Sequence, residues 1–481
     1  MPPKSDENET LLSGSPNNSE NADTQVFEND NQATYIICKS KEPYVNPTVP
    51  KGTKPEDVMK TLNLDLGQTF VNADSKIAIW IIRFLSSVCV EWWEFLFFRF
   101  WKFLPLSFRR GLTHYGWKVY LKLHKALLGR STGMHPSQSP EYHALTSIMW
   151  WGRLFPISPE RMRFALSQLY VCTPNVVEAY KVETIEQEMP MANVEKKGNS
   201  PTDGNRDDDF SIPSCQESHN TVRGMFLHHG NEPTEHLIFW LYGGAYLSGD
   251  VLGNSSAADW VAKQTKMDVF VPDFRLAPEG DLNDVLWDVA LAYKWLLGKT
   301  GKDPSQIYFL GVSSGAAICI RLMQLMVVQQ NGEKTLPEYI PKMGATPKGA
   351  VLFGPYVDYT KEKKGSFLHY PRLDLVVNES VQRDGLPYLE QFIPDGRRKE
   401  YSPVYQSMKG LPPLCVVASE HEAVYDMTME VVRRAREDGV SVTVGIWKYM
   451  CHVFTFLWGF IPEGKQSMEF ACSWIREEAA E

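Results

Sequence analysis

From about residue 222 to the C-terminus, short apolar runs alternate with amphipathic helical periods, and this alternation constrains the fold more than any other feature of the sequence. Strands spaced by helices predict a mostly parallel sheet that is covered by helices on both faces. In such a sheet the ligand site lies beyond the carboxyl ends of the strands. We expect strands at residues 236–242, 269–273, 306–310, 350–353, 414–418 and 441–447, with helices that include residues 282–297 and 427–438.

Residues 311–315 read Gly-Val-Ser-Ser-Gly and lie between an expected strand and an expected helix. The G-x-S-x-G pattern alone is weak, because an ordinary strand-to-helix turn in a Gly-rich chain can contain it. In this setting, however, a sharp turn lifts a serine hydroxyl clear of the sheet, and the glycines leave room for it. The pattern therefore predicts Ser313 as a nucleophile, with the amide of Ser314 directed at a substrate oxyanion from a helix N-terminus.

Three motifs in this order resemble those of the hormone-sensitive-lipase family of α/β-hydrolases, which includes the arylacetamide deacetylases. Residues 242–245 (Tyr-Gly-Gly-Ala) resemble the family's H-G-G-G or H-G-G-A, and residues 311–315 resemble G-D-S-A-G. Residues 273–279 (D-F-R-L-A-P-E) resemble D-Y-R-L-A-P-E and are the most specific match. The resemblance covers roughly residue 156 to the C-terminus. It implies an α/β-hydrolase fold with an N-terminal helical cap.

The resemblance also implies an oxyanion hole made of backbone amides, which two glycines allow to approach a carbonyl closely. Tyr242 stands where the family usually has His, and Val312 stands where it usually has Asp. Each departure removes a polar support of the loop and leaves the reacting groups in place, so it bears on rate more than on reaction type. The implied donors are the amides of Gly244, Ala245 and Ser314, with Gly243 as a weaker candidate that shapes the same loop.

The acid and base of a catalytic triad are implied in the same way. Glu422 occupies the position of the family's acid, a few residues after a Leu-Pro-Pro segment and a strand, while Glu420 and Asp426 remain rivals. His452 follows the last expected strand and matches the histidine of the family's G-x-x-H-x-F segment. The chain order Ser, acid, His is that of the α/β-hydrolases.

These residues predict a serine esterase or lipase that cleaves lipid-like or acetyl esters through an acyl-enzyme at Ser313. An amidase or deacetylase would use the same groups. A non-catalytic small-molecule-binding protein on a hydrolase scaffold is a further alternative, which Tyr242 and Val312 keep open. The chain has eight cysteines and no C-x-x-C pair, so a zinc or redox motif has no support. The expected acyl-enzyme mechanism needs neither a metal nor an organic cofactor.

The predicted organisation has three parts. Residues 1–60 are acidic and poor in apolar side chains, which predicts a disordered tail. Residues 61–151 predict a helical cap or membrane-interfacial segment, and residues 152–481 predict the catalytic domain. Within this domain residues 185–220 are polar and predict a surface loop. The net charge of −9 argues against nucleic acid as a partner.

Residues 77–130 combine aromatic side chains with unbalanced positive charge. No acid occurs between residues 95 and 140. The best apolar run, residues 77–90, contains Arg83 and is shorter than the roughly 20 residues that a spanning helix needs. We therefore expect a helix that lies on a membrane surface, with a purely structural cap as the alternative. The first 35 residues contain no secretory signal. On the basis of residues 77–130 we expect a membrane-associated protein, at the endoplasmic reticulum or the cytoplasmic face.

Overall fold

The computed structural model describes 15 separate stretches of the chain, and the account below is confined to them. The longest stretch contains four strands of the central sheet, and the last contains two more strands and the C-terminal helix. The described residues are 24–28, 34–38, 103–129, 135, 138–152, 162–163, 166, 181–188, 221–333, 340–360, 365–370, 374–378, 381–382, 389–393 and 395–480.

A ten-stranded sheet runs through these described residues in the order β1-β2-β10-β9-β8-β7-β5-β6-β4-β3. The six strands from β10 to β6 are parallel, and antiparallel strands flank them on both sides. The parallel strands are β5 (Leu237–Leu241), β6 (Asp268–Asp273), β7 (Ile307–Val312), β8 (Gly349–Phe353), β9 (Leu414–Ser419) and β10 (Val442–Trp447). All six expected strands are present, with ends that differ by one or two residues, and the predicted α/β-hydrolase fold is confirmed.

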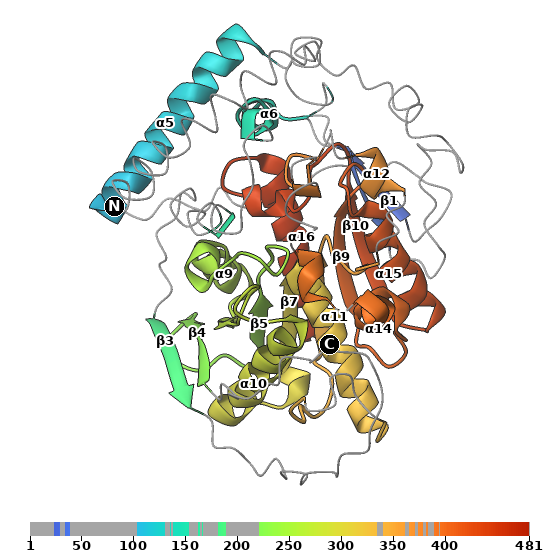
Figure 1. Cartoon of the computed structure of the whole chain (residues 1–481). Helices are drawn as coiled ribbons and strands as arrows, with labels where there is room; N and C mark the ends of the chain where they lie inside the picture. The colour runs from blue at the N-terminus through green and yellow to red at the C-terminus, as the bar shows by residue number, and fades with distance from the viewer. Residues whose placement is uncertain are drawn as a thin grey trace.

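Helices cover both faces of the sheet (Figure 1). The central strands β5, β7, β8 and β9 are buried along their whole length, because a parallel sheet with helices on both sides exposes neither face to water. Helices α9 (Val251–Thr265) and α16 (Pro462–Ala480) pack together on one face. On the other face lie α10 (Leu282–Thr300), α11 (Ser314–Gln330) and α15 (Tyr425–Glu437).

Local sequence sets the ends of α10. The Asp281 side chain accepts hydrogen bonds from the backbone of Asn283 and Asp284, and the Asp284 side chain accepts one from the Asp281 amide. This capping box satisfies amide groups that the first turn of a helix leaves unpaired. Gly301 ends the helix in the left-handed region, with φ of 66°. Helix α10 therefore begins and ends where its own residues dictate, close to the expected 282–297.

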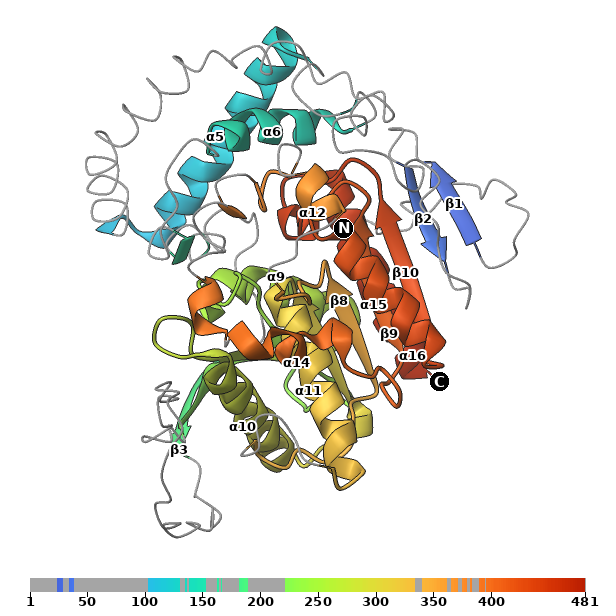
Figure 2. The same ribbon diagram turned by 45° about the vertical axis from the view of Figure 1, so that its right-hand side comes forward.

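Two strands lie inside the predicted disordered tail, so that expectation is wrong for these segments. Strands β1 (Thr24–Glu28) and β2 (Thr34–Cys38) form an antiparallel pair, and β2 also pairs with β10. Figure 2 shows them at the edge of the sheet beside β10. The acidic composition of residues 1–60 conceals the run Thr-Tyr-Ile-Ile-Cys, which has the β-branched and aromatic side chains that strands favour. The rest of the predicted tail lies outside the described residues.

The predicted loop at 185–220 is also shorter than expected. Strand β3 (Lys181–Glu188) takes its first residues and pairs with β4 (Thr221–His228). The Ile185 side chain is buried, and the Trp295 indole of α10 donates a hydrogen bond of 2.8 Å to the side chain of Gln187. Strand β3 lies at the edge of the sheet, where charged side chains on one face can remain in water. In the sequence, the same charged residues favoured a surface loop. Residues 189–220 lie outside the described residues.

N-terminal to β3, the structure describes helices α5 (Leu106–Leu127) and α6 (Pro140–Gly152), which pack against each other above the sheet (Figure 2). They fall in the predicted helical cap at 61–151. Residues 92–103 are rich in aromatic side chains, and all of them except Phe103 lie outside the described residues. No helix in the described ranges is both long and apolar enough to cross a bilayer. Two short helices, α12 (Ser366–His369) and α14 (Arg398–Tyr401), lie between β8 and β9.

Candidate active site

Ser313 sits in a strained turn between β7 and α11. Its φ of 53° and ψ of −115° lie in a region that non-glycine residues rarely adopt, which costs on the order of 1–3 kcal/mol. The Ser313 amide donates a hydrogen bond of 2.8 Å to the carbonyl of Phe353, and the Ser313 carbonyl accepts from the amides of Tyr356 and Ala317. The neighbouring strand β8 and the first turn of α11 thus hold the strained backbone, and the Ser313 side chain remains half-buried.

The glycines of the pentapeptide are required by space. A Cβ atom on Gly315 would lie 2.1 Å from the carbonyl oxygen of Leu241, at the end of β5. One on Gly311 would lie 2.6 Å from the Cα of Ala316. No side chain fits at either position, so the two glycines let the serine turn lie directly against the neighbouring strand.

The structure brings Ser313, His452 and Glu422 into one hydrogen-bonded chain. The Nε2 atom of His452 is 2.8 Å from the Oγ atom of Ser313, and its Nδ1 atom is 2.8 Å from Oε2 of Glu422. His452 and Glu422 are both buried, and the Ser419 amide donates a further hydrogen bond to Oε1 of Glu422. Each residue comes from the carboxyl end of a different strand: β7, β9 and β10.

The two rival carboxylates lie elsewhere. The Asp426 side chain accepts a hydrogen bond of 2.8 Å from the Ser366 amide at the start of α12. Glu420 is buried, and its amide donates to the Trp447 carbonyl of the adjacent strand β10. Of the three carboxylates, only Glu422 forms a hydrogen bond with His452 in the described structure.

Opposing influences act on the pKa of the His452 imidazole. Burial alone would lower it, but the hydrogen bond and negative charge of Glu422, together with the charge of Asp374, raise the pKa above its ordinary value of 6.5. Burial raises the pKa of the Glu422 carboxyl, while His452 and the Ser419 amide oppose that effect. The environment therefore stabilises an imidazolium beside Glu422, and this is the species that forms when the imidazole removes a proton from Ser313.

The predicted oxyanion loop follows β5 and lies against the serine turn. A Cβ atom on Gly243 would lie 3.0 Å from the Cβ of Ser313. Gly244 has φ of 132° and Ala245 has φ of 55°, and the Gly244 carbonyl accepts hydrogen bonds from the Leu247 and Ser248 amides. Among the described residues, the amides of the four predicted donors have no hydrogen-bond acceptor, which leaves them available to a substrate oxygen. These donors are Gly243, Gly244, Ala245 and Ser314.

The two departures from the family pattern are both buried. The Tyr242 ring stacks on Phe274, with centroids 4.2 Å apart and planes at 12°. Its hydroxyl accepts a hydrogen bond from the Phe274 amide and donates to Asp273, both at 3.3 Å. Tyr242 therefore gives the loop an aromatic and polar support of its own. Val312 is the last residue of β7, where it pairs with Phe353.

Residues 273–279 hold this loop in place. The Ala277 amide donates a hydrogen bond of 2.8 Å to the Tyr246 carbonyl. The Arg275 guanidinium forms ion pairs with Asp284 and Asp288 of α10, at 2.9 and 2.7 Å. A planar guanidinium presents its N–H donors in a fixed fork, so it binds both carboxylates in defined directions. The motif thus fastens the oxyanion loop to α10.

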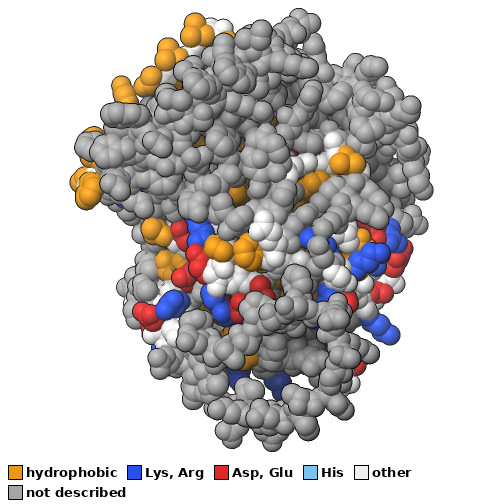
Figure 3. All heavy atoms as spheres, in the orientation of Figure 1, with side chains coloured by type: hydrophobic (Ala, Val, Ile, Leu, Met, Phe, Trp, Pro, Cys, Tyr) orange, Lys and Arg blue, Asp and Glu red, His pale blue; other side chains and the backbone are white. Residues whose placement is uncertain are grey.

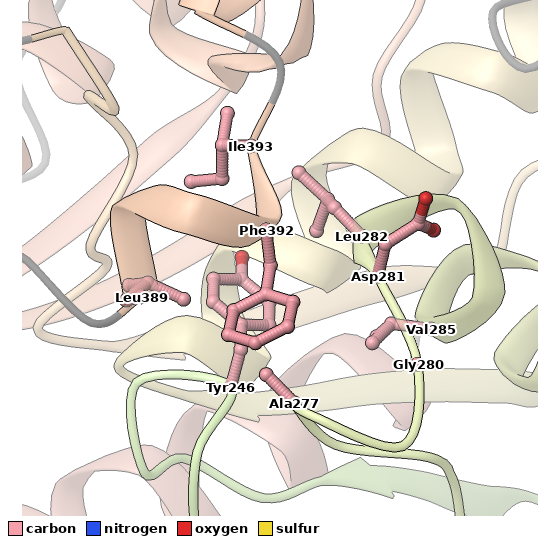
Figure 4. A pocket seen from close by; sticks show the side chains of 9 residues that line it. All are labelled: Tyr246, Ala277, Gly280, Asp281, Leu282, Val285, Leu389, Phe392 and Ile393. Atoms are coloured by element: carbon pink, nitrogen blue, oxygen red, sulfur yellow. The ribbon is translucent and has the colours of Figure 1, made fainter. Parts of the chain in front are cut away.

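A small pocket opens beside the Tyr246 side chain (Figure 4). Apart from Asp281 its walls are mostly apolar, and Phe392 and Leu389 close it from the segment between β8 and β9. In this conformation it has room for about one water molecule. The lining residues are Tyr246, Ala277, Gly280, Asp281, Leu282, Val285, Leu389, Phe392 and Ile393.

Gly354 belongs to the site but was not foreseen. It follows β8, has φ of 50°, and donates its amide to the Val417 carbonyl. A Cβ atom on Gly354 would lie 2.9 Å from Oε2 of Glu422 and 3.0 Å from Cε1 of His452. Its signal in the sequence is a glycine directly after an apolar strand, at the edge where ligand sites form. In the described part of the chain, no cluster of His, Cys, Asp and Glu could hold a metal ion.

We predict that Gly354→Ala displaces the imidazole and carboxylate that its methyl group would meet. The reaction of Ser313 with a fluorophosphonate should slow by roughly 10- to 100-fold, because small displacements of reacting groups are costly. Gly298→Ala is the control, since a Cβ there meets nothing within 4 Å. Equal labelling rates for the two folded variants, measured by intact-protein mass spectrometry, would contradict the prediction.

Comparison with known proteins agrees with this geometry. A family model described as an alpha/beta hydrolase fold matches residues 238–456, which include Ser313, Glu422 and His452. An esterase of Acinetobacter venetianus is 28% identical over 241 residues, which are 49% of this chain and 75% of that protein. An acetyl-hydrolase of Streptomyces hygroscopicus is 24% identical over 244 residues, which are 51% of this chain and 76% of that protein.

Solved structures show the same fold. An esterase from the bacterial hormone-sensitive lipase family has a TM-score of 0.55 and 22% identity, and the match covers 71% of this chain and 99% of that one. The esterase EstE5, soaked with p-nitrophenyl butyrate, has a TM-score of 0.53 and 21% identity, with coverage of 71% and 100%. The chain therefore has the α/β-hydrolase fold, and over about half of its length it is similar to bacterial proteins named esterase and acetyl-hydrolase.

Proposed function

We propose that this protein is a carboxylic ester hydrolase that acts through an acyl-enzyme on Ser313. The observation that carries the proposal is the continuous chain from Ser313 through His452 to Glu422, with both hydrogen bonds at 2.8 Å. Such a chain activates a serine hydroxyl, which is otherwise a weak nucleophile. The relatives named esterase and acetyl-hydrolase support esters, and short acyl groups in particular, as the substrate class.

Each group in the site then has one part in the reaction. Neutral His452 takes the Ser313 proton as the serine oxygen attacks the ester carbonyl, and it returns that proton to the leaving alcohol. Amides of the oxyanion loop and of Ser314 stabilise the tetrahedral oxyanion. Glu422 holds the imidazole by its Nδ1 atom and stabilises the imidazolium. A water molecule then repeats the sequence on the acyl-enzyme and releases the acid.

We predict that a fluorophosphonate labels the wild-type protein at Ser313 and that p-nitrophenyl acetate or butyrate is hydrolysed. Ser313→Ala should remove the labelling and lower kcat by roughly 1,000-fold or more. Ser305→Ala is the control, because Ser305 is exposed and precedes the opposite end of β7. A wild-type protein that is neither labelled nor active would refute the proposed hydrolase activity. Hydrolysis of acyl anilides, tested in parallel, would reveal an amidase.

The raised pKa of His452 predicts the pH dependence. The imidazole must be neutral to act as a base, so kcat/KM should fall as pH drops, with a midpoint above about 6.5. Glu422→Gln removes the charge that raises this pKa and leaves burial to lower it. The midpoint should therefore move to lower pH, while kcat falls by at least roughly 100-fold. An unchanged midpoint, read from kcat/KM across a pH series, would be inconsistent with this arrangement.

We propose further that the protein acts at a membrane surface through α5. Exposed apolar side chains recur every three or four residues along this helix and so share one face. Figure 3 shows them along the outer edge of the molecule. The set comprises Phe108, Leu112, Tyr115, Val119, Leu123 and Leu127.

Charge and packing on α5 support an anionic lipid surface as the occupant of this face. The helix contains no acidic residue, and Lys118, Lys122 and Lys125 are exposed, although Lys125 is paired with Glu141 of α6 at 2.8 Å. Its opposite side packs on the protein, where the Trp117 ring meets Phe460 edge-on at 5.3 Å. An apolar face flanked by basic residues is the pattern of a helix that lies in the headgroup layer.

We predict that the full chain floats with vesicles of phosphatidylcholine and phosphatidylserine, and less with phosphatidylcholine alone. The double variant Leu112→Gln and Leu123→Gln should weaken partitioning by roughly tenfold or more, because two apolar side chains would no longer be buried in lipid. Leu252→Gln with Leu368→Gln is the matched control, since these leucines are 51% and 52% exposed, against 48% and 55% on α5. Equal flotation of the two variants would refute the assignment to α5.

A further inference from the structure

The loop that carries His452 is held by its backbone amides in an unusual way. Four consecutive amides, from residue 449 to residue 452, each donate to the side chain of a different residue. Tyr449 donates to His421 at 3.1 Å, and Met450 to Ser419 at 3.1 Å. Cys451 donates to Tyr142 at 2.8 Å, and His452 to Asp374 at 3.1 Å.

These side chains come from three parts of the fold. Ser419 is the last residue of β9, His421 follows it, and both belong to the same segment as Glu422. Asp374 lies between β8 and β9, and Tyr142 lies on α6, 309 positions before Cys451. The loop therefore depends for its position on two segments outside the strands that supply Ser313, Glu422 and His452.

Asp374 joins the segment of the acid to the loop of the base. Its side chain is 1% exposed. Oδ2 accepts the amide of Ala423, next to Glu422, at 2.8 Å, and Oδ1 accepts the amide of His452. Oδ1 also accepts the amides of Val376 and Val377, which fix its own segment. A buried carboxylate is stable when its oxygens are satisfied in this way, and its geometry is then rigid.

Tyr142 fixes the same loop from α6. Its side chain is fully buried, and Gln138 nearby donates from its side chain to the Tyr449 carbonyl. Glu463 of α16 accepts both the amide and the hydroxyl of Ser139, at 2.8 and 2.9 Å. The start of α6 is thus anchored to the catalytic domain, so the phenol meets the loop from a fixed point.

We propose that Asp374 and Tyr142 are positioning residues that hold the backbone of the His452 loop at the distance from Ser313 and Glu422 that catalysis requires. The inference rests on the proposed esterase function. Neither residue touches the reacting atoms, and both act through amides of the loop. If Tyr142 has this role, the N-terminal helical segment formed by α5 and α6 contributes to catalysis, in addition to any contact that it makes with lipid.

The first test is Tyr142→Phe, which removes one hydroxyl and keeps the ring. We expect kcat to fall by roughly 10- to 100-fold, because the Cys451 amide loses its acceptor and the imidazole shifts. KM should change little, since the oxyanion loop and Ser313 are untouched. Tyr293→Phe is the matched control, a fully buried tyrosine in α10 whose hydroxyl has no hydrogen-bond partner among the described residues.

The second test is Asp374→Asn, which keeps the shape and removes the charge. We expect the same fall in kcat, and in addition a lower midpoint on the acid side of the kcat/KM profile. The sign follows from the negative charge of Asp374, which raises the pKa of His452. Asp268→Asn is the control, because Asp268 is a buried carboxylate that accepts the His229 amide at the opposite end of the sheet. The titratable groups around the loop are Glu422, Asp374, Tyr142, Cys451 and His421.

The outcomes separate the two proposals. If the wild type is active, Ser313→Ala is inactive, and Tyr142→Phe and Asp374→Asn behave like their controls, the positioning roles are wrong and the esterase stands. If Ser313→Ala keeps the activity, the esterase at Ser313 itself is wrong. Should Asp374→Asn fail to fold by circular dichroism, Tyr142→Phe still decides: a lower kcat at unchanged KM and unchanged pH midpoint supports the inference, and wild-type kcat overturns it.

Discussion

The close contact between the start of α11 and the end of β5 is the constraint on which the site depends. At Gly315 the helix lies so near the Leu241 carbonyl that a single Cβ atom would be 2.1 Å from it. This contact places the serine turn beside the loop that follows β5, so nucleophile and oxyanion donors share one edge of the sheet. The backbone strain at Ser313 is tolerated because β8 and α11 hold both sides of the turn with hydrogen bonds.

The same edge contains the buried carboxylates of Glu422 and Asp374, and such charges are costly to remove from water. Glu422 is satisfied by His452 and the Ser419 amide, and Asp374 is satisfied by four backbone amides. Buried charges of this kind are weak evidence for added stability. Here the charges fix two loops relative to each other and raise the pKa of the imidazole between them.

The helices before the catalytic domain link the two roles that we propose for this segment, contact with a membrane surface and positioning of the catalytic base. One face of α5 is apolar and exposed, while Trp117 packs against Phe460 on the other side. Helix α6 follows, and its first residues contact α16 through Ser139 and the base loop through Tyr142. A segment that looks like an addition to the hydrolase is therefore continuous with it in hydrogen bonding. The boundary predicted at residue 151 follows a change in the sequence pattern, whereas in the folded chain hydrogen bonds cross that boundary.

Local patterns in the sequence determined much of the fold and the core of the site. Periodicity placed the six parallel strands, and glycine spacing around Ser313 identified the turn, because both depend on sterics within a few residues. The motif match also placed Glu422 and His452, although it left Glu420 and Asp426 as rivals. The sequence analysis missed strands β1 and β2. The acidic composition of residues 1–60 predicted disorder, although the segment contains a short apolar run.

Only the tertiary structure decided which carboxyl lies against the imidazole and what holds the imidazole in place. Glu420, Glu422 and Asp426 lie within seven positions, yet only the packing of strand ends shows that Glu422 reaches His452. Gly354 and Tyr142 gave no comparable signal, because their importance arises from atoms that are distant in sequence. Sterics and periodicity act between near neighbours and can be read along the chain, whereas the contacts that align a catalytic base form only when separate loops meet at the edge of the sheet.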